Sequence, residues 1–170
     1  LSATATTGDI TDSGNLTITG AATFITGVDE SNIVLDSSGN AFSNSVEMRA
    51  DAGGEDFGNI TFVDSAGIDF ATSAGSNGDL FINGSTDGTV GGNLSVTATT
   101  GNITDTVAVV TTGSSTSSFT TSATNGTITL NTPASLAGAV TINTTGASGH
   151  ATIDNGTTAL IIAASSIGGN

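Results

Sequence analysis

The sequence predicts an all-β protein whose short strands stack into a solenoid. Three observations carry this prediction: the composition, a recurring five-residue motif and a longer internal repeat. Of the 170 residues, 24 are glycine and one is proline, and charged residues make up only 9% of the chain. Hydrophobic residues amount to 36% and fall in short alternating stretches, as in strands with one buried face. This alternation favours a buried sheet core over a disordered linker, although Ser, Thr, Gly and Asn are abundant.

The five-residue motif combines a turn with a strand. It reads Gly-Asn-Leu-Thr-Ile at 14–18, and related versions begin at residues 58, 78, 92, 126 and 138. Glycine gives the backbone freedom that a turn requires, Asn or Asp tolerates the left-handed region, and the third and fifth residues point to one side of an extended strand. Each copy therefore predicts a corner followed by a short strand. The corner residues of the clearest copies are Gly14, Asn15, Gly58, Asn59, Gly92 and Asn93.

The same alternation predicts which side chains face the interior. Apolar pairs recur at intervals of mostly about ten to fourteen residues, too short for a strand plus a crossover helix, and no 3.6-residue period is present. We therefore expect no helix. The expected core residues are Leu16, Ile18, Ile33, Leu35, Ile60, Phe62, Leu80, Ile82, Leu94, Val96, Ile128, Leu130, Val140 and Ile142. Val46, Met48, Ile68, Phe70, Leu160 and Ile162 follow the same pattern.

A longer repeat distinguishes a solenoid from a meander. The segment LSATATTGDITDS at 1–13 returns as LSVTATTGNITDT at 94–106, 93 residues later, and repetition at this scale is typical of stacked arrays. It predicts two imperfect units, an acidic one at 1–93 and a nearly uncharged one at 94–170, in one continuous rod. Gly-Gly-Asn precedes Leu94 and also ends the chain, so we expect the chain to be an in-register segment of a longer tandem array.

The charge balance and the missing residue types exclude several functions. One Lys or Arg against 15 Asp and Glu gives a net charge of -14, which leaves no basic surface for nucleic acid. No apolar run reaches the roughly 18 to 20 residues of a membrane-spanning helix. Because the chain has no cysteine and a single histidine, His150, we expect no enzyme and no cofactor. A polysaccharide-cleaving β-helix is the enzymatic alternative, but sugar sites usually carry aromatic platforms, and the chain has no Trp and no Tyr.

Two binding hypotheses arise from polar patterns. Asp51, Glu55 and Asp56 lie in a glycine-rich stretch whose oxygens would suit calcium, although the stretch does not match the β-roll repeat; the alternative is that acidity keeps a fibre soluble. Alternating threonines, such as Thr97 and Thr99, would place hydroxyls on one face, as in ice-binding solenoids. Ice binding would require one such pair per coil at a fixed period. The sequence spacing is irregular, and the β propensity of threonine explains it.

The repeated phrases also carry a family resemblance. GNLTITGAATFITG at 14–27, TATTGDITDSGNLTI at 4–18 and GGNLSVTATTGNITD at 91–105 resemble the repeats of filamentous-haemagglutinin-like bacterial surface proteins. The resemblance covers nearly all of 1–106, while 107–170 keeps the spacing of the motifs but matches their sequence less closely. It implies a right-handed parallel β-helix in a secreted, cell-surface protein.

From the repeat and this resemblance, we expect a non-catalytic structural repeat of an extracellular bacterial fibre or adhesin stalk. Its partners would be neighbouring repeats of the same chain, with lateral or end-to-end fibre assembly and a cell-surface or glycan target. No nucleic acid and no membrane insertion are expected. The alternative is an adhesin module that binds calcium or a glycan through the acidic stretch around Asp51, Glu55 and Asp56.

Overall fold

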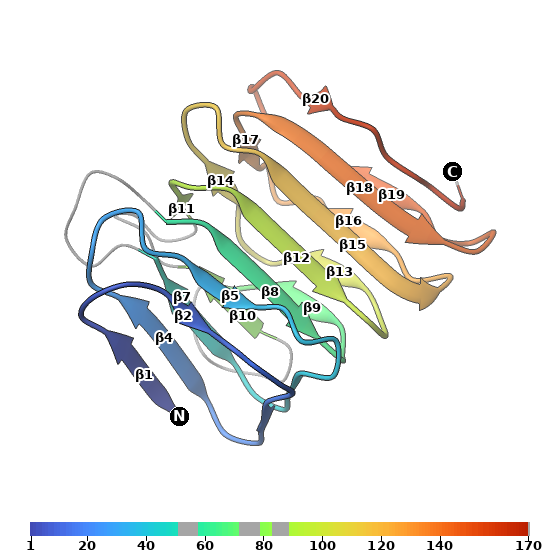
Figure 1. The fold of residues 1–170 in the computed structure, drawn as a ribbon. Helices are drawn as coiled ribbons and strands as arrows, with labels where there is room; N and C mark the ends of the chain where they lie inside the picture. Colours follow the sequence, from blue (N-terminus) through green and yellow to red (C-terminus); the bar gives the residue numbers. More distant parts are fainter. Residues whose placement is uncertain (51–57, 72–78, 83–88, 170) are drawn as a thin grey trace.

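The computed structural model describes residues 1–50, 58–71, 79–82 and 89–169. Parallel strands stack in it as a β-solenoid of about six turns, and no helix occurs in the described residues. Figure 1 shows the coils side by side, with the N-terminus and the C-terminus at opposite ends of the stack. The all-β solenoid predicted from the sequence is therefore confirmed.

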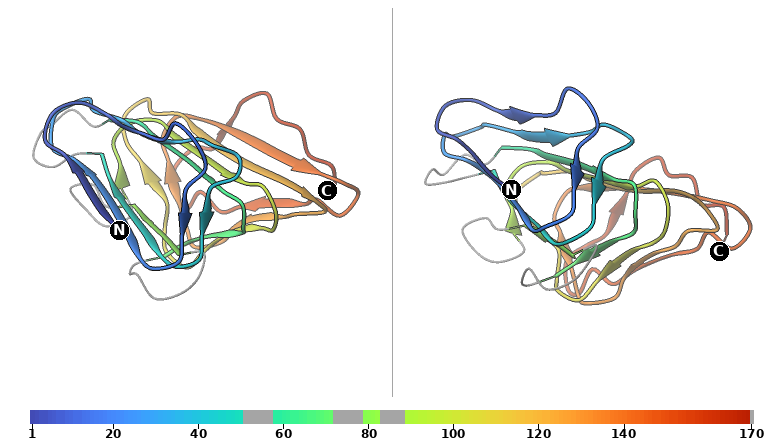
Figure 2. Two further views of the ribbon diagram at one scale, coloured as in Figure 1. Left: turned by 60° about the horizontal axis from the view of Figure 1, so that its bottom comes forward. Right: turned by 90° about the horizontal axis from the view of Figure 1, so that it is seen from below.

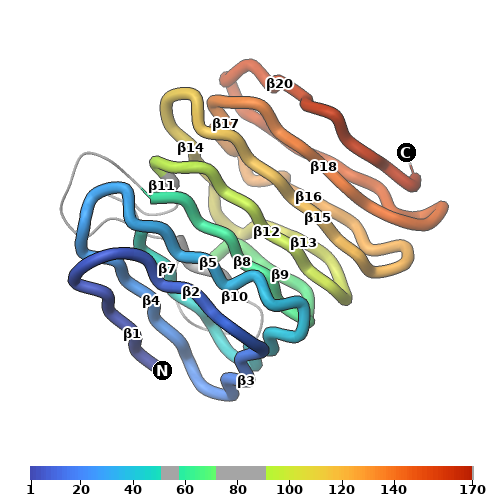
Figure 3. Tube along the Cα trace, viewed as in Figure 1, coloured from blue at the N-terminus to red at the C-terminus, as the bar shows by residue number. Residues whose placement is uncertain are grey.

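Two long parallel sheets form the main walls of the solenoid. The eight-stranded sheet has the order β1 (Ser2–Ala5), β4 (Ala22–Thr26), β7 (Val46–Arg49), β10 (Asp79–Ile82), β9 (Ile68–Phe70), β13 (Ile103–Asp105), β16 (Ile128–Leu130), β19 (Ala151–Ile153). The seven-stranded sheet has the order β2 (Ile10–Thr11), β5 (Ile33–Leu35), β8 (Ile60–Asp64), β12 (Leu94–Ala98), β15 (Ser117–Thr124), β18 (Ala139–Thr145), β20 (Ile161–Ile162). Figure 3 traces the path that alternates between these walls.

A short third side changes position along the rod. Near the N-terminus it consists of β3 (Thr17–Ile18) and β6 (Ala41–Phe42), which follow strands of the seven-stranded sheet. Further along it consists of β11 (Thr89–Val90), β14 (Val110–Thr111) and β17 (Ser135–Leu136), which instead precede strands of that sheet. The third side therefore moves from one corner of the coil to the other, while successive coils still overlap in projection (Figure 2).

The two copies of the long repeat occupy opposite walls. Residues 1–13 place β1 in the eight-stranded sheet and β2 in the seven-stranded sheet, whereas residues 94–106 place β12 in the seven-stranded sheet and β13 in the eight-stranded sheet. Between β8 and β12 the chain enters the eight-stranded sheet twice, as β9 and then β10, and β10 lies between β7 and β9. Equivalent sequence thus turns to the opposite face of the rod after one repeat.

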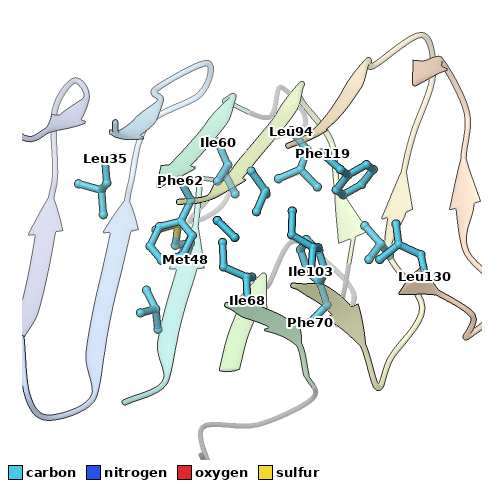
Figure 4. Packing of buried hydrophobic residues seen from close by; sticks show 14 of the residues in the cluster. Leu35, Met48, Ile60, Phe62, Ile68, Phe70, Leu94, Ile103, Phe119 and Leu130 are labelled. Carbon is cyan, nitrogen blue, oxygen red and sulfur yellow. The ribbon is translucent and has the colours of Figure 1, made fainter. Parts of the chain in front are cut away.

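The core is a continuous column of apolar side chains between the walls (Figure 4). Ten of the expected core residues are no more than 7% exposed: Ile33, Leu35, Ile60, Phe62, Leu94, Val96, Ile128, Leu130, Val140 and Ile142. Leu16 and Ile18, in the first coil, are partly buried and pack against the core from one side. Leu80 and Ile82 lie in β10, but their side chains are outside the described part.

Three aromatic residues join the core beyond the expected pairs. Phe24, Phe42 and Phe119 are at most 2% exposed, and Phe42 packs at a ring-centroid distance of 6.3 Å from Phe24 and 5.2 Å from Phe62. Leu160 and Ile162 were expected to face inward, but they are 39% and 51% exposed. This expectation was wrong because β20 is only two residues long and no described coil stacks on its far side.

Candidate functional site

A ladder of polar side chains joins successive coils along one corner of the rod. Asp9 Oδ1 accepts the Asn32 amide at 2.7 Å, Asn32 Oδ1 accepts the Asn59 amide at 2.8 Å, and Asn59 Oδ1 accepts the Asn93 amide at 2.8 Å. Asn93 Oδ1 then accepts the Thr116 amide at 2.7 Å. We call these five residues the corner ladder. Each rung fixes the next coil at one defined height.

Backbone hydrogen bonds at the corner ladder run in the opposite direction, from amides of one coil to carbonyls of the ladder residues in the next coil. The amide of Ile33 donates to the Asn59 carbonyl at 3.0 Å, and the amide of Ile60 donates to the Asn93 carbonyl at 2.9 Å. Asn32, Asn59 and Asn93 therefore each accept one bond from the next coil through the side chain and a second from the previous coil through the backbone carbonyl. Because polar groups of both coils are satisfied together, the corner couples neighbouring coils without any ligand.

Glycines in front of the ladder allow the coils to approach closely. A Cβ on Gly92 would lie 2.3 Å from the Gly58 carbonyl oxygen, and a Cβ on Gly58 would lie 1.8 Å from the Ser31 carbonyl oxygen. Neither glycine is among the described residues with positive φ. We expected the Asn of these corners to adopt the left-handed region, but neither Asn59 nor Asn93 has a positive φ, so this expectation was wrong. Close stacking of backbone on backbone requires glycine here, while the following Asn supplies the acceptor.

The remaining predicted corner belongs to a different column. Gly14 and Asn15 precede β3 on the third side, and a Cβ on Gly14 would meet nothing within 4 Å. In the next coil, Asn40 is fully buried; its Oδ1 accepts the Leu16 amide at 2.8 Å, and its Nδ2 donates to Asp12 Oδ2 at 2.6 Å. The same motif therefore occupies two structurally distinct corners.

Two carboxylates lie in the interior. Asp64 is 2% exposed at the end of β8, and its Oδ1 accepts the amides of Phe42 and Ala66, both at 3.3 Å. Asp105 is 7% exposed, and its Oδ1 accepts the Asn131 amide at 2.8 Å. Burial raises the pKa of both carboxyls, because desolvation penalises the charged form more than these hydrogen bonds favour it. For Asp105, the nearby charge of Asp69 raises the pKa further.

Asp12, the counterpart of Asp105 in the first repeat, shows the opposite balance. Burial by itself raises its pKa, but hydrogen bonds from Asn40 Nδ2 and from the amides of Ser37 and Asp36 outweigh that effect. The pKa of Asp12 therefore lies below the ordinary aspartate value. In both repeats the aspartate that ends the Ile-Thr-Asp segment holds the backbone of the following coil.

The residues expected to bind calcium fall in a stretch that the structure does not describe. Asp51, Glu55 and Asp56 lie outside the described residues. Within the described ranges, no three His, Cys, Asp or Glu side chains are grouped so that they could hold a metal ion. No helix long and apolar enough to cross a membrane is found in that part of the chain. The described polar clusters instead bind the backbone of neighbouring coils.

Sequence reasoning missed most of this polar framework. Asp9, Asn32, Asn40, Asp64 and Asp105 were not among the predicted site residues. A usable signal exists for the corner ladder, since each rung directly precedes the first inward residue of a strand, one coil after the previous rung. Asp64 and Asp105 give a weaker signal, because each occupies an inward position where the alternation would place an apolar residue.

Comparison with known proteins gives a partial match. Residues 1–49 match a family described as repeats of unknown function (DUF5649). No curated protein and no solved structure shows significant similarity to the chain. The matched segment holds the first two coils and the first strand of the third, so sequence comparison and structure both indicate a repeat protein.

Proposed function

We propose that the chain is a non-catalytic structural repeat in an extracellular bacterial surface fibre or adhesin stalk. The observation that supports this most directly is the bonding between the described coils. Parallel strand pairs connect them along the rod, and the corner ladder adds side-chain bonds from Asp9 to Thr116. Such a structure transmits load and orientation along its axis through many similar contacts. No single side chain then has to be indispensable.

The surface charge fits a fibre that stays separate in solution. The net charge is -14, and 13 of the 15 acidic residues lie before residue 91. Like charge on neighbouring rods opposes lateral aggregation, which exposed strand edges would otherwise favour. The resemblance to filamentous-haemagglutinin-like repeats supports the assignment to a secreted surface protein.

A tandem duplication of the chain tests the structural role. Two copies joined from Asn170 to Leu1 should form one rod, and its largest dimension in small-angle X-ray scattering should exceed that of one copy by about 30 Å, from about six turns at roughly 4.8 Å each. Two globules joined at variable angles would contradict a continuous rod. A single copy and a two-copy chain with a flexible glycine-serine linker are the controls.

Location requires a separate experiment. Antibodies raised against the chain, used with gold labels on intact cells of the producing bacterium, should mark filaments outside the envelope. Label found only inside permeabilised cells would contradict the surface assignment, while leaving the rod itself intact.

A further inference from the structure

The outer face of the seven-stranded sheet carries an ordered array of small polar side chains. Thr61, Ser95, Ser118 and Thr141 are cross-strand neighbours in one column over β8, β12, β15 and β18. Thr97, Thr120 and Asn143 form a second column two residues further along each strand. We call these seven residues the hydroxyl face. Figure 1 shows no other strand of the described residues lying over this wall.

The outward pairs recur once per coil over β12, β15 and β18, where successive coils are 23 residues long. The coil between β8 and β12 is 34 residues long, and the β8 residue paired with Thr97 is Val63. The Thr120 and Asn143 side chains are 23 residues apart, and Asn93 and Thr116, at the corner of the same coils, have the same separation. From the sequence we paired Thr97 with Thr99, and pairs of that kind are irregularly spaced along the chain. In the structure, Thr99 lies beyond the end of β12 and is not part of this face. The outward pairs are Ser95 with Thr97 and Ser118 with Thr120, followed by Thr141 with Asn143.

Packing beneath the face holds the array rigid. Val96, Phe119 and Ile142 alternate with the outward residues and are 0%, 0% and 7% exposed. Asn143 Nδ2 donates to Thr120 Oγ1 at 3.3 Å, which links two of the three residues of the second column. The columns are about 6.6 Å apart along each strand, and the rows are about 4.8 Å apart across strands. The face therefore presents a fixed two-dimensional grid of hydrogen-bonding groups.

The side chains of the hydroxyl face limit the kinds of ligand that it can bind. None of the seven residues is charged, in a chain of net charge -14, so no fixed ion imposes its own hydration shell on the face. The chain has neither Trp nor Tyr for stacking on sugar rings. What remains is a neutral surface whose hydroxyl and amide groups can hydrogen-bond water, with threonine methyl groups between them.

We propose that the hydroxyl face binds ice. The prism faces of hexagonal ice present oxygen atoms at regular spacings of the same order as this grid, so waters held by the side chains can join the crystal lattice. This activity is independent of the stalk role. A chain can be a rod whether or not its face adsorbs to ice.

Incorporation into ice tests the proposal directly. A fluorescently labelled chain in buffer is exposed to a slowly growing single-crystal ice hemisphere, and its concentration is measured in the ice and in the remaining liquid. The wild-type chain should be enriched in the ice and should shape the growing crystal. Exclusion of the wild-type chain into the liquid, as for serum albumin, would overturn the proposal.

Two variants locate the binding face. Thr97→Lys with Thr120→Lys places two charged side chains on the hydroxyl face and should lower incorporation by about tenfold, which corresponds to about 1.4 kcal/mol. Thr129→Lys with Thr104→Lys makes the matched change on the outer face of the eight-stranded sheet and should leave incorporation unchanged. Circular dichroism melting checks that both variants fold. Equal loss in both folded variants would overturn the assignment to this face.

Discussion

Asn59 lies directly beneath Asn93 in the corner ladder, and its Oδ1 accepts the Asn93 backbone amide at 2.8 Å. Through Nδ2, Asn59 also donates to Oδ1 of Asn32 at 2.8 Å, so one side chain spans three coils. The bond to Asn93 crosses a coil of 34 residues, longer than the 23-residue coils that follow. The ladder thus keeps its geometry where the coil length varies most.

Removing this rung should weaken the rod locally. Asn59→Ala leaves the Asn93 amide without its side-chain acceptor, and because the site is exposed, water replaces part of the bond. We expect a loss of about 1 kcal/mol and a melting temperature lower by about 2–4 °C. Thermal denaturation followed by circular dichroism measures this shift. Asn15→Ala, in the same motif but outside the ladder, is the control, and an equal shift there would contradict a special role for the corner.

Glycine at the stacked corner should be required for packing. In Gly92→Ala the new Cβ would lie 2.3 Å from the Gly58 carbonyl oxygen, a backbone atom that can move only with its coil. We expect a loss of about 3 kcal/mol, measured by urea denaturation. Gly14→Ala is the matched control, because nothing lies within 4 Å of its Cβ position and its φ is not positive. It should be neutral or stabilising by about 0.5 kcal/mol.

Local sequence could predict the strands and the inward residues, because both depend on alternation within a few residues. Pairs such as Leu94 with Val96 and Ile128 with Leu130 are buried where the pattern placed them. The stacking partners could not be predicted in the same way. They depend on coil length, which changes from 23 residues between Asp9 and Asn32 to 34 between Asn59 and Asn93.

The same limit applies to the polar residues of the candidate site. Asn59 and Asn15 occupy identical motif positions, yet only Asn59 stands in the corner ladder, because the neighbour that it bonds comes from another coil. The opposite walls taken by β1 and β12 are likewise invisible in their nearly identical sequences. Both outcomes depend on which coils pair and in which register, and a five-residue motif does not determine that pairing.

One buried position is poorly matched to its environment. Ser117 is 3% exposed, its Oγ has no hydrogen-bond partner, and it lies between Leu94 and Val140 in the strand register. Ser117→Ala removes the buried hydroxyl and should raise the free energy of unfolding by about 1 kcal/mol. Ser118→Ala, the outward neighbour, should change it by less than about 0.5 kcal/mol. Urea denaturation of both variants compares them, and a destabilised Ser117→Ala would show that the hydroxyl is satisfied in solution.

Stability should increase on mild acidification. Burial raises the pKa of Asp64 and Asp105 in the folded chain, so the folded state holds protons more tightly than the unfolded state. The cost of burying these charges is present above the folded pKa values and is relieved as the pH falls through them. We therefore expect the melting temperature to rise from pH 7 toward about pH 4, near the aspartate pKa of the unfolded chain. Asp12, whose pKa is lowered, opposes this trend only at still lower pH.

Neutralising one buried carboxyl should separate this effect from general charge repulsion. Asp64→Asn keeps an oxygen that can accept the amides of Phe42 and Ala66 but cannot ionise. The variant should be more stable than the wild-type chain at pH 7, and the difference should shrink as the pH approaches about 4. Asp36→Asn removes an equal charge from an exposed site and serves as the control. If both variants showed the same pH dependence, the acid stabilisation would come from net charge rather than from the buried carboxyl.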